Sequence, residues 1–169
     1  MSIDETEPED DLHRSDNPAA LSRDRLEVAS LTAGDLDALV RIDTKLTARD
    51  RRDYIATKLD EALLDSGIRV SLTARTDGIV AGYLMARIDF GDFGRTEPVA
   101  VIDTVGIDPD FAGLGVAKAL LSQLLVNLRA LRVEKVETTV AREDLDLLAF
   151  LYHCGFQPAQ RIALVKQID

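Results

Sequence analysis

Residues 101–121 constrain this chain most, because an apolar run, a turn with two glycines and an apolar periodic segment follow one another there. The pattern predicts a strand, a loop and a helix. Gly113 and Gly115 lack side chains, so the backbone can approach a ligand closely. The first N–H groups of the helix have no partner within it and lie at the positive end of its dipole. We therefore expect a phosphate or pyrophosphate at this turn.

Two other phosphate-binding motifs fit the turn poorly. A Walker loop requires Lys and then Ser or Thr after its last glycine, whereas Val116 and Ala117 follow Gly115 here. A Rossmann fingerprint requires a third Gly or Ala at the position that Lys118 holds. A Rossmann-type nucleotide binder remains an alternative, and it predicts affinity for NAD.

The turn resembles motif A of the GNAT superfamily of N-acetyltransferases. The usual motif is Arg/Gln-x-x-Gly-x-Gly/Ala after a strand that ends in a Val-x-Pro-like sequence. Residues 105–109 and 112–117 match this pattern in both glycines and in the final small residue, Ala117. Ala112 stands where the family has Arg or Gln, which removes one side-chain contact to the pyrophosphate and leaves the backbone contacts.

A second resemblance covers residues 147–156, which are similar to motif B of the same family, Asn-x-x-Ala-x-x-Phe-Tyr-x-x-x-Gly-Phe. Gly155 and Phe156 match its last two positions. Asp144 then falls on the usual Asn and Leu151 on the usual Tyr, so Tyr152 lies one residue late.

The rest of the sequence predicts the element order β, α, α, β, β, β, α, β, α, β, which is also the order of the family. The expected segments are a strand at 26–31, helices at 32–43 and 47–66 with Gly67 as the end of the second, hairpin strands at 68–74 and 79–88 joined at 76–78, a loop at 91–96, a strand at 97–107, a helix to 131, a strand at 133–140, a helix at 144–155 and a final strand at 161–168. The expected class is α+β, with a central, twisted, mixed but mostly antiparallel sheet and helices on both faces.

The resemblance implies acetyl-CoA as the co-substrate. Its pantetheine arm is expected along the backbone of the strand that ends at Ile107, and its pyrophosphate on the N–H groups of residues 113–118. The expected cofactor-binding residues are Val105, Gly106, Ile107, Ala112, Gly113, Leu114, Gly115, Val116, Ala117 and Lys118. The side chain of Lys118 either adds charge to this site or is an ordinary surface lysine.

Acetyl transfer requires a neutral amine, and amines of the lysine type are almost fully protonated at pH 7, so a base is useful. Asp103 is the candidate base because its strand leads to the expected thioester. Glu97 is the alternative, because it is six residues earlier in the same predicted strand and its side chain is expected on the same face. Tyr152 is the candidate acid for the leaving thiolate. Each also has a structural interpretation, Asp103 as a hydrogen-bonding group and Tyr152 as a core side chain.

Composition limits the remaining possibilities. The formal net charge is −10, which argues against nucleic acid as a partner. The chain has one cysteine, Cys154, and two histidines, so neither a disulfide nor a metal site is expected. No run of about twenty apolar residues and no signal peptide is visible, which predicts a cytoplasmic protein without a membrane span.

The expected domain organisation is a disordered acidic tail at 1–24 and one acetyltransferase domain at 25–169. The expected function is transfer of acetyl from acetyl-CoA to an amine, either of a small molecule or of a protein. The alternative is a non-catalytic acyl-CoA-binding sensor or interaction module with the same fold. Family habit suggests a homodimer, with the final strand as a contact.

Overall fold

The computed structural model describes residues 26–64, 68, 70–91 and 97–168. These residues group into two compact units, one up to Glu137 and one from Thr138 onward, and each is described by itself. The acidic tail, the predicted helix end at Gly67 and most of the loop at 91–96 lie outside the described residues. Their assignments stay predictions.

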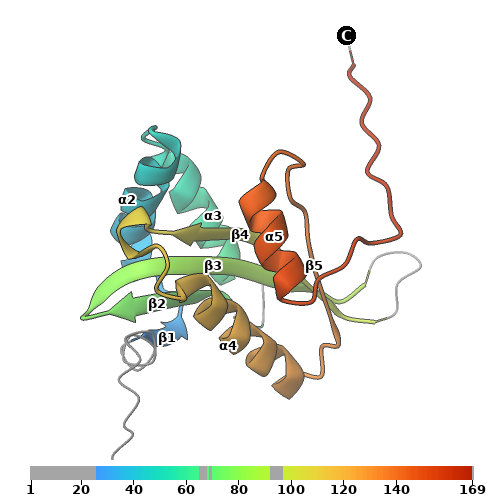
Figure 1. Cartoon of the computed structure of the whole chain (residues 1–169), viewed down its shortest axis with the longest axis horizontal. Coiled ribbons are helices and arrows are strands. Elements are labelled where there is room, and N and C mark those ends of the chain that lie inside the picture. Colours follow the sequence, from blue (N-terminus) through green and yellow to red (C-terminus); the bar gives the residue numbers. More distant parts are fainter. Residues whose placement is uncertain (1–25, 65–67, 69, 92–96, 169) are drawn as a thin grey trace, which may run out of the picture. The chain divides into compact units, whose positions relative to one another are not determined.

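The first unit is built on a five-stranded sheet whose strands lie in sequence order (Figure 1). The strands are β1 (Glu27–Ser30), β2 (Leu72–Thr76), β3 (Ile79–Asp89), β4 (Val99–Ile107) and β5 (Lys135–Thr138). The pairs β1–β2, β2–β3 and β3–β4 are all antiparallel. The predicted mostly antiparallel sheet is confirmed, although β5 is shorter than the predicted strand at 133–140.

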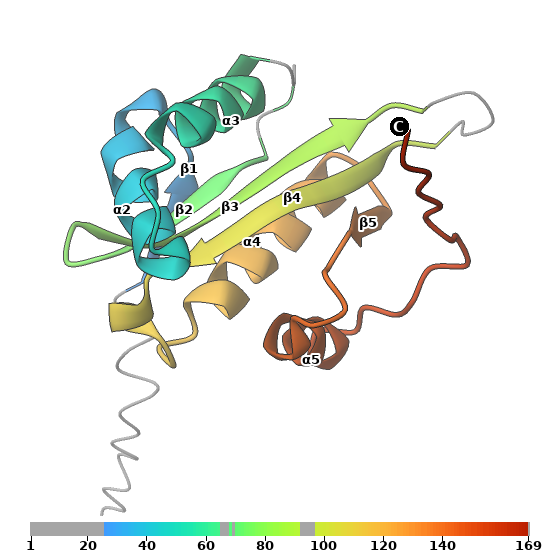
Figure 2. The same cartoon turned by 90° about the horizontal axis from the view of Figure 1, so that it is seen from above.

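Helices cover both faces of this sheet, as predicted (Figure 2). On one face lie α2 (Leu36–Thr47), which follows the short 3₁₀ turn η1 (Ala33–Asp35), and α3 (Arg52–Leu64). Their apolar side chains pack with those of β3 in one buried cluster, which includes Leu39, Ile42, Ile55, Leu59, Tyr83 and Met85. On the other face lies α4 (Val116–Ala130), whose buried side chains recur at helical spacing as Val116, Leu120, Leu124 and Leu128.

Two features predicted from short sequence patterns, a hairpin turn and a helix start, are present in the structure. Asp77 and Gly78 have φ of 50° and 79°, as a two-residue type I′ hairpin turn requires, and they join β2 to β3. Before η1, the backbone N–H of Thr32 donates to the carboxylate of Asp35 at 2.8 Å, and the Thr32 hydroxyl donates to it at 2.9 Å. The predicted helix start at Thr32 is therefore fixed by its own side chains.

Two predicted boundaries on this side of the sheet are wrong. Thr47 ends α2 rather than beginning the next helix, because Ala48 adopts a left-handed conformation with φ of 55°. Strand β2 begins at Leu72 and not at residue 68. The hydroxyl of Ser71 takes the place of the sheet ladder there, donating to the Ala86 carbonyl at 3.1 Å and accepting from its N–H at 3.0 Å.

The second unit contains α5 (Leu145–His153), in agreement with the predicted helix between Asp144 and Gly155. The Asp144 carboxylate accepts from the N–H of Leu147 at 3.2 Å, and Gly155 has φ of 90° just after the helix.

The predicted final strand at 161–168 is wrong, because none of these residues forms a strand. Its apolar side chains are 84–93% exposed, namely Ile162, Leu164, Val165 and Ile168. An apolar, β-branched run forms a strand only where a sheet edge supplies hydrogen-bond partners, and the pairings found among the described residues do not reach this segment. The expected homodimer, with a contact through these residues, stays a prediction.

Candidate active site

The turn after β4 has the backbone conformation that its glycines allow. A short 3₁₀ turn, η2 (Pro109–Phe111), leads into Gly113 and Gly115, whose φ values are 79° and 77°. A Cβ added to either glycine would meet nothing within 4 Å. Backbone conformation, rather than crowding by the protein, therefore requires glycine here, and the space over the turn is open to a ligand.

Helix α4 begins at this turn with unused donors. Its first internal hydrogen bond runs from the N–H of Ala119 to the carbonyl of Gly115 at 2.9 Å, so the N–H groups of Val116, Ala117 and Lys118 precede the helical bonding. Gly115 has no side chain to cap them, and the first turn contains no acidic residue. The arrangement can bind an anion.

Two of the predicted cofactor-binding amides are already used within the turn. The N–H of Ala112 donates to the Pro109 carbonyl at 3.2 Å, and that of Leu114 donates to the Phe111 carbonyl at 3.4 Å. The anion-binding capacity therefore rests on the amides that follow them in the sequence.

A buried ion pair anchors the base of the turn. Asp108 is 1% exposed and accepts two hydrogen bonds from Lys45 Nζ, at 2.8 and 3.0 Å, and one from the N–H of Asp110 at 3.0 Å. The Nε of Arg41 lies 3.6 Å from the same carboxylate. Burial alone raises the pKa of Asp108, but these hydrogen bonds outweigh it, so the pKa is lowered from its usual value. The network ties α2 to the turn.

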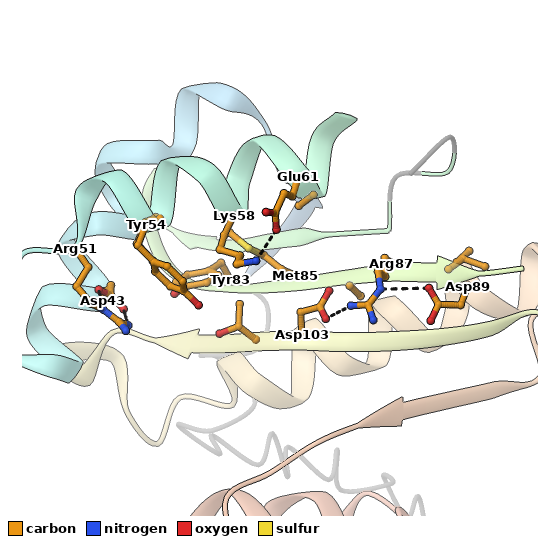
Figure 3. Close-up of a pocket in the computed structure, with 15 residues that line it drawn as sticks. Asp43, Arg51, Tyr54, Lys58, Glu61, Tyr83, Met85, Arg87, Asp89 and Asp103 are labelled. Carbon is orange, nitrogen blue, oxygen red and sulfur yellow. Dashed lines mark hydrogen bonds and ion pairs between the residues drawn. The ribbon is translucent and has the colours of Figure 1, made fainter. Parts of the chain in front are cut away.

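A cavity of about 570 Å³ opens between α3 and the strands β3 and β4, on the face opposite α4 (Figure 3). It is lined by Asp43, Arg51, Tyr54, Ile55, Lys58, Glu61, Ala62, Tyr83, Met85, Ala86, Arg87, Ile88, Asp89, Asp103 and Thr104. The predicted base, Asp103, is one of these residues. The cavity and the glycine turn both adjoin β4.

Asp103 lies at a break in the regular pairing of β3 with β4. Met85 pairs with Thr104 and Ala86 pairs with Ile102, so Asp103 is the extra residue of a β-bulge. Its carboxylate accepts a short hydrogen bond from Nη1 of Arg87. The hydrogen bond to Asp103, more than any other cause, raises the pKa of Arg87.

The other charged groups of the cavity are also paired. Nε and Nη2 of Arg51 donate to the Asp43 carboxylate at 3.0 and 2.5 Å, and the Arg51 guanidinium lies 5.0 Å from the centre of the Tyr54 ring. Nζ of Lys58 donates to Glu61 at 2.6 Å. These hydrogen bonds are the main cause of the raised pKa values of Arg51 and Lys58.

Tyr83 forms the buried end of the cavity next to Gly106. A Cβ on Gly106 would lie 2.4 Å from the Tyr83 ring, so glycine at this position makes room for the ring. Burial raises the pKa of Tyr83 to about 12, so its hydroxyl keeps its proton at neutral pH. The sequence pattern had suggested only a backbone role for Gly106.

The remaining predicted residues are not among those that line the cavity. Glu97 is exposed and accepts a hydrogen bond from Nζ of Lys135 at 2.8 Å, which is the main cause of its lowered pKa. Val105 and Ile107 pair with Leu84 and Gly82 within the sheet. Tyr152 belongs to α5 in the second unit and is 55% exposed. The catalytic and pantetheine-binding roles of these residues stay predictions.

Sequence reasoning missed the basic residues of the cavity. Arg51 and Lys58 are seven residues apart and share a helical face with Tyr54, a spacing visible in the sequence. Arg87 is a charged residue that follows a run of mostly apolar residues in β3, with Asp89 two positions later. Both signals were available, but the pairing of Arg87 with Asp103 depends on the register of β3 and β4.

Two structural features are absent from the described residues. No helix there is long and apolar enough to cross a bilayer. No three side chains of the His, Cys, Asp or Glu type gather there in a way that could hold a metal ion.

Comparisons with known proteins agree with this arrangement. The model of the acetyltransferase (GNAT) family matches residues 36–156. Aminoglycoside N(6')-acetyltransferase type 1 of Stenotrophomonas maltophilia is 24% identical over 111 residues, which is 64% of this chain and 72% of that protein.

Solved structures share the fold at lower identity. An aminoglycoside N-acetyltransferase, AAC(6')-Iy, in complex with CoA has a TM-score of 0.71 and 17% identity, covering 84% of this chain and 94% of that chain. A ribosomal-protein-alanine N-acetyltransferase from Brucella melitensis biovar Abortus 2308 has a TM-score of 0.65 and 20% identity, covering 85% and 99%. Because the family match spans most of the chain and both family motifs, this chain belongs to the GNAT family and is an acetyl-CoA-dependent acyltransferase.

Proposed function

We propose that this chain transfers the acetyl group of acetyl-CoA to the nitrogen of an amine bound in the cavity beside β4. The observation that carries the proposal is that the expected diphosphate site adjoins β4 and the candidate base lies on this strand. The open N-terminus of α4 follows β4 after the turn at 108–115, and the bulge of β4 brings Asp103 to the cavity. The turn fits a diphosphate because it combines positive-φ glycines, unused amides and no acidic side chain in the first helical turn.

The residues of the cavity can support transfer to a neutral amine. Acetyl-CoA supplies an acyl group on a thioester, whose thiol leaving group, with a pKa of about 8.5, needs little assistance. The amine nitrogen forms a bond to the acyl carbon as the carbon–sulfur bond breaks, and the amine must lose a proton. The Asp103 carboxylate is available to take that proton, directly or through a water molecule. No covalent enzyme intermediate is required.

Two measurements test this function together. Calorimetry with acetyl-CoA should show binding, and a free-thiol assay with a panel of amines should show thiol release that depends on the amine. Binding without amine-dependent release would contradict the enzyme and favour the acyl-CoA-binding module. Binding of NAD in place of acetyl-CoA would contradict the assignment of the turn.

Replacing Asp103 by asparagine should lower kcat about tenfold, because the amide cannot accept the proton, while bulk water and neighbouring groups accept it in part. Affinity for acetyl-CoA should change less than about twofold. Asp37→Asn is the matched control, because Asp37 is an exposed carboxylate bound to Arg52 and does not line the cavity. Equal loss of turnover and of cofactor affinity in Asp103→Asn would reject the base role.

A further inference from the structure

The cavity has nearly balanced charge, in contrast to the chain as a whole, which has a formal charge of −10. Four carboxylates and three cationic side chains line it. Each cation is bound to at least one of the carboxylates, and the ion pairs join Arg51 to Asp43, Lys58 to Glu61, and Arg87 to both Asp89 and Asp103. A polycationic acceptor entering this cavity would therefore meet positive as well as negative groups.

Arg87 is the cation best placed to meet an acceptor. Its side chain is 47% exposed and lies between two carboxylates, with Nη1 donating to Asp103 and Nε donating to Asp89 at 3.2 Å (Figure 3). Nη2 forms no hydrogen bond with any of the described residues. A guanidinium with unused N–H groups at its edge is well suited to a carboxylate, because its N–H groups lie in one plane and match the two carboxylate oxygens.

Lys58 is a second cation in the lining of the cavity. It lines the same cavity as Asp103, and its ammonium, which donates to Glu61 at 2.6 Å, points from α3 toward the strands that border the cavity (Figure 3). An amine that approaches Asp103 therefore comes close to both Lys58 and Arg87. Neighbouring positive charge disfavours the protonated form of an amine, and the carboxylates of the lining favour it, so the two cations offset part of the effect of the carboxylates.

These contacts point to one class of acceptor for the proposed acetyl transfer. We propose that the cavity binds a small amine that carries its own carboxylate, such as an amino acid or short peptide, with the nitrogen at Asp103 and the carboxylate on Arg87. The inference rests on the proposed function for the reaction itself. The acceptor's carboxylate would pair with the Nη2 group of Arg87, whereas every carboxylate of the lining already has a cationic partner, so a second ammonium group would meet no unpaired carboxylate there.

The proposal separates this chain from the relatives whose names specify aminoglycosides. An aminoglycoside carries several amino groups, which are cationic at neutral pH, and it has no carboxylate to place on Arg87. The sequence identity of 24% to such an enzyme leaves room for a different acceptor. Neamine and spermidine therefore serve as polycationic probes in the test.

The test is equilibrium binding to the protein saturated with CoA, which has no acetyl group and so prevents reaction. β-Alanine, γ-aminobutyrate and glycylglycine are each compared with the corresponding carboxamide by calorimetry. We expect the best carboxylate to bind about tenfold tighter than its amide and tighter than neamine or spermidine. Arg87→Gln should reduce the preference for carboxylate to about twofold or less and leave binding of the amides within about twofold.

Arg52→Gln is the matched control. Arg52 lies on α3 and, like Arg87, pairs with an exposed carboxylate, here that of Asp37, but it does not line the cavity. Equal affinity for carboxylates and carboxamides, tighter binding of neamine, or equal loss of both ligand types in Arg87→Gln would overturn the proposal. Because binding needs no turnover, a carboxylate preference without thiol release would support this inference while contradicting the proposed function.

Discussion

Replacing Gly115 by aspartate should reduce the affinity for acetyl-CoA by at least about 100-fold. The new carboxylate would stand at the start of α4, beside the amides of Val116 and Ala117 that precede the helical bonding. It would compete for these donors and repel a diphosphate. Loss of two hydrogen bonds to a charged group, at about 1.5–3 kcal/mol each, is enough for a change of this size. Calorimetric titration with acetyl-CoA measures it.

The φ of 77° at Gly115 means that any side chain there adds backbone strain, so two controls are needed. Gly115→Ala introduces the strain without the charge and should lower affinity far less than aspartate. Gly78→Asp introduces both at a turn of similar geometry, with φ of 79° and open space, between β2 and β3. Unchanged affinity in Gly115→Asp, or an equal loss in Gly78→Asp, would show that the turn does not hold the diphosphate.

The strand, turn and helix around Gly115 could be predicted because each depends on local sequence. The apolar run, the positive-φ glycines and the helical spacing of Leu120, Leu124 and Leu128 all lie within about thirty residues of one another. The hairpin at Asp77 and Gly78 is local in the same sense. Family resemblance then supplied the order of the elements and a ligand for the turn.

Features that depend on tertiary structure were not predictable in this way. Lys45 reaches Asp108 across 63 positions of sequence, and nothing in either segment marks the other as its partner. The bulge at Asp103 follows from how β3 and β4 align, and this alignment also brings Arg87 to the candidate base. The strand predicted at 161–168 was wrong for the converse reason. Its apolar pattern is local, but a strand needs an edge with which to pair.

The bond between Lys45 and Asp108 leads to the second large expected effect. Asp108→Asn should lower the free energy of unfolding by about 2–4 kcal/mol at pH 7, because it leaves the Lys45 ammonium and the Arg41 guanidinium facing a neutral group. The new amide nitrogen is also a donor and cannot accept from Lys45. Urea denaturation followed by circular dichroism measures the loss.

The pH dependence of this loss separates the ion pair from simple packing. The pKa of Asp108 is lowered in the folded protein, so its contribution is complete above the unfolded value of about 3.9 and disappears as the pH falls through the lower folded value. Asparagine does not titrate. The stability difference between the two proteins should therefore be constant from about pH 7 to pH 5 and should shrink below about pH 4.

Asp37→Asn provides the comparison at the surface. Asp37 pairs with Arg52 at 2.6 Å, but their side chains are 84% and 53% exposed, so this substitution should change stability by less than about 0.5 kcal/mol. If Asp108→Asn costs no more than this control, the turn is not anchored through α2. A large loss that persists unchanged at pH 3 would instead mean that shape, and not charge, holds Asp108 in place.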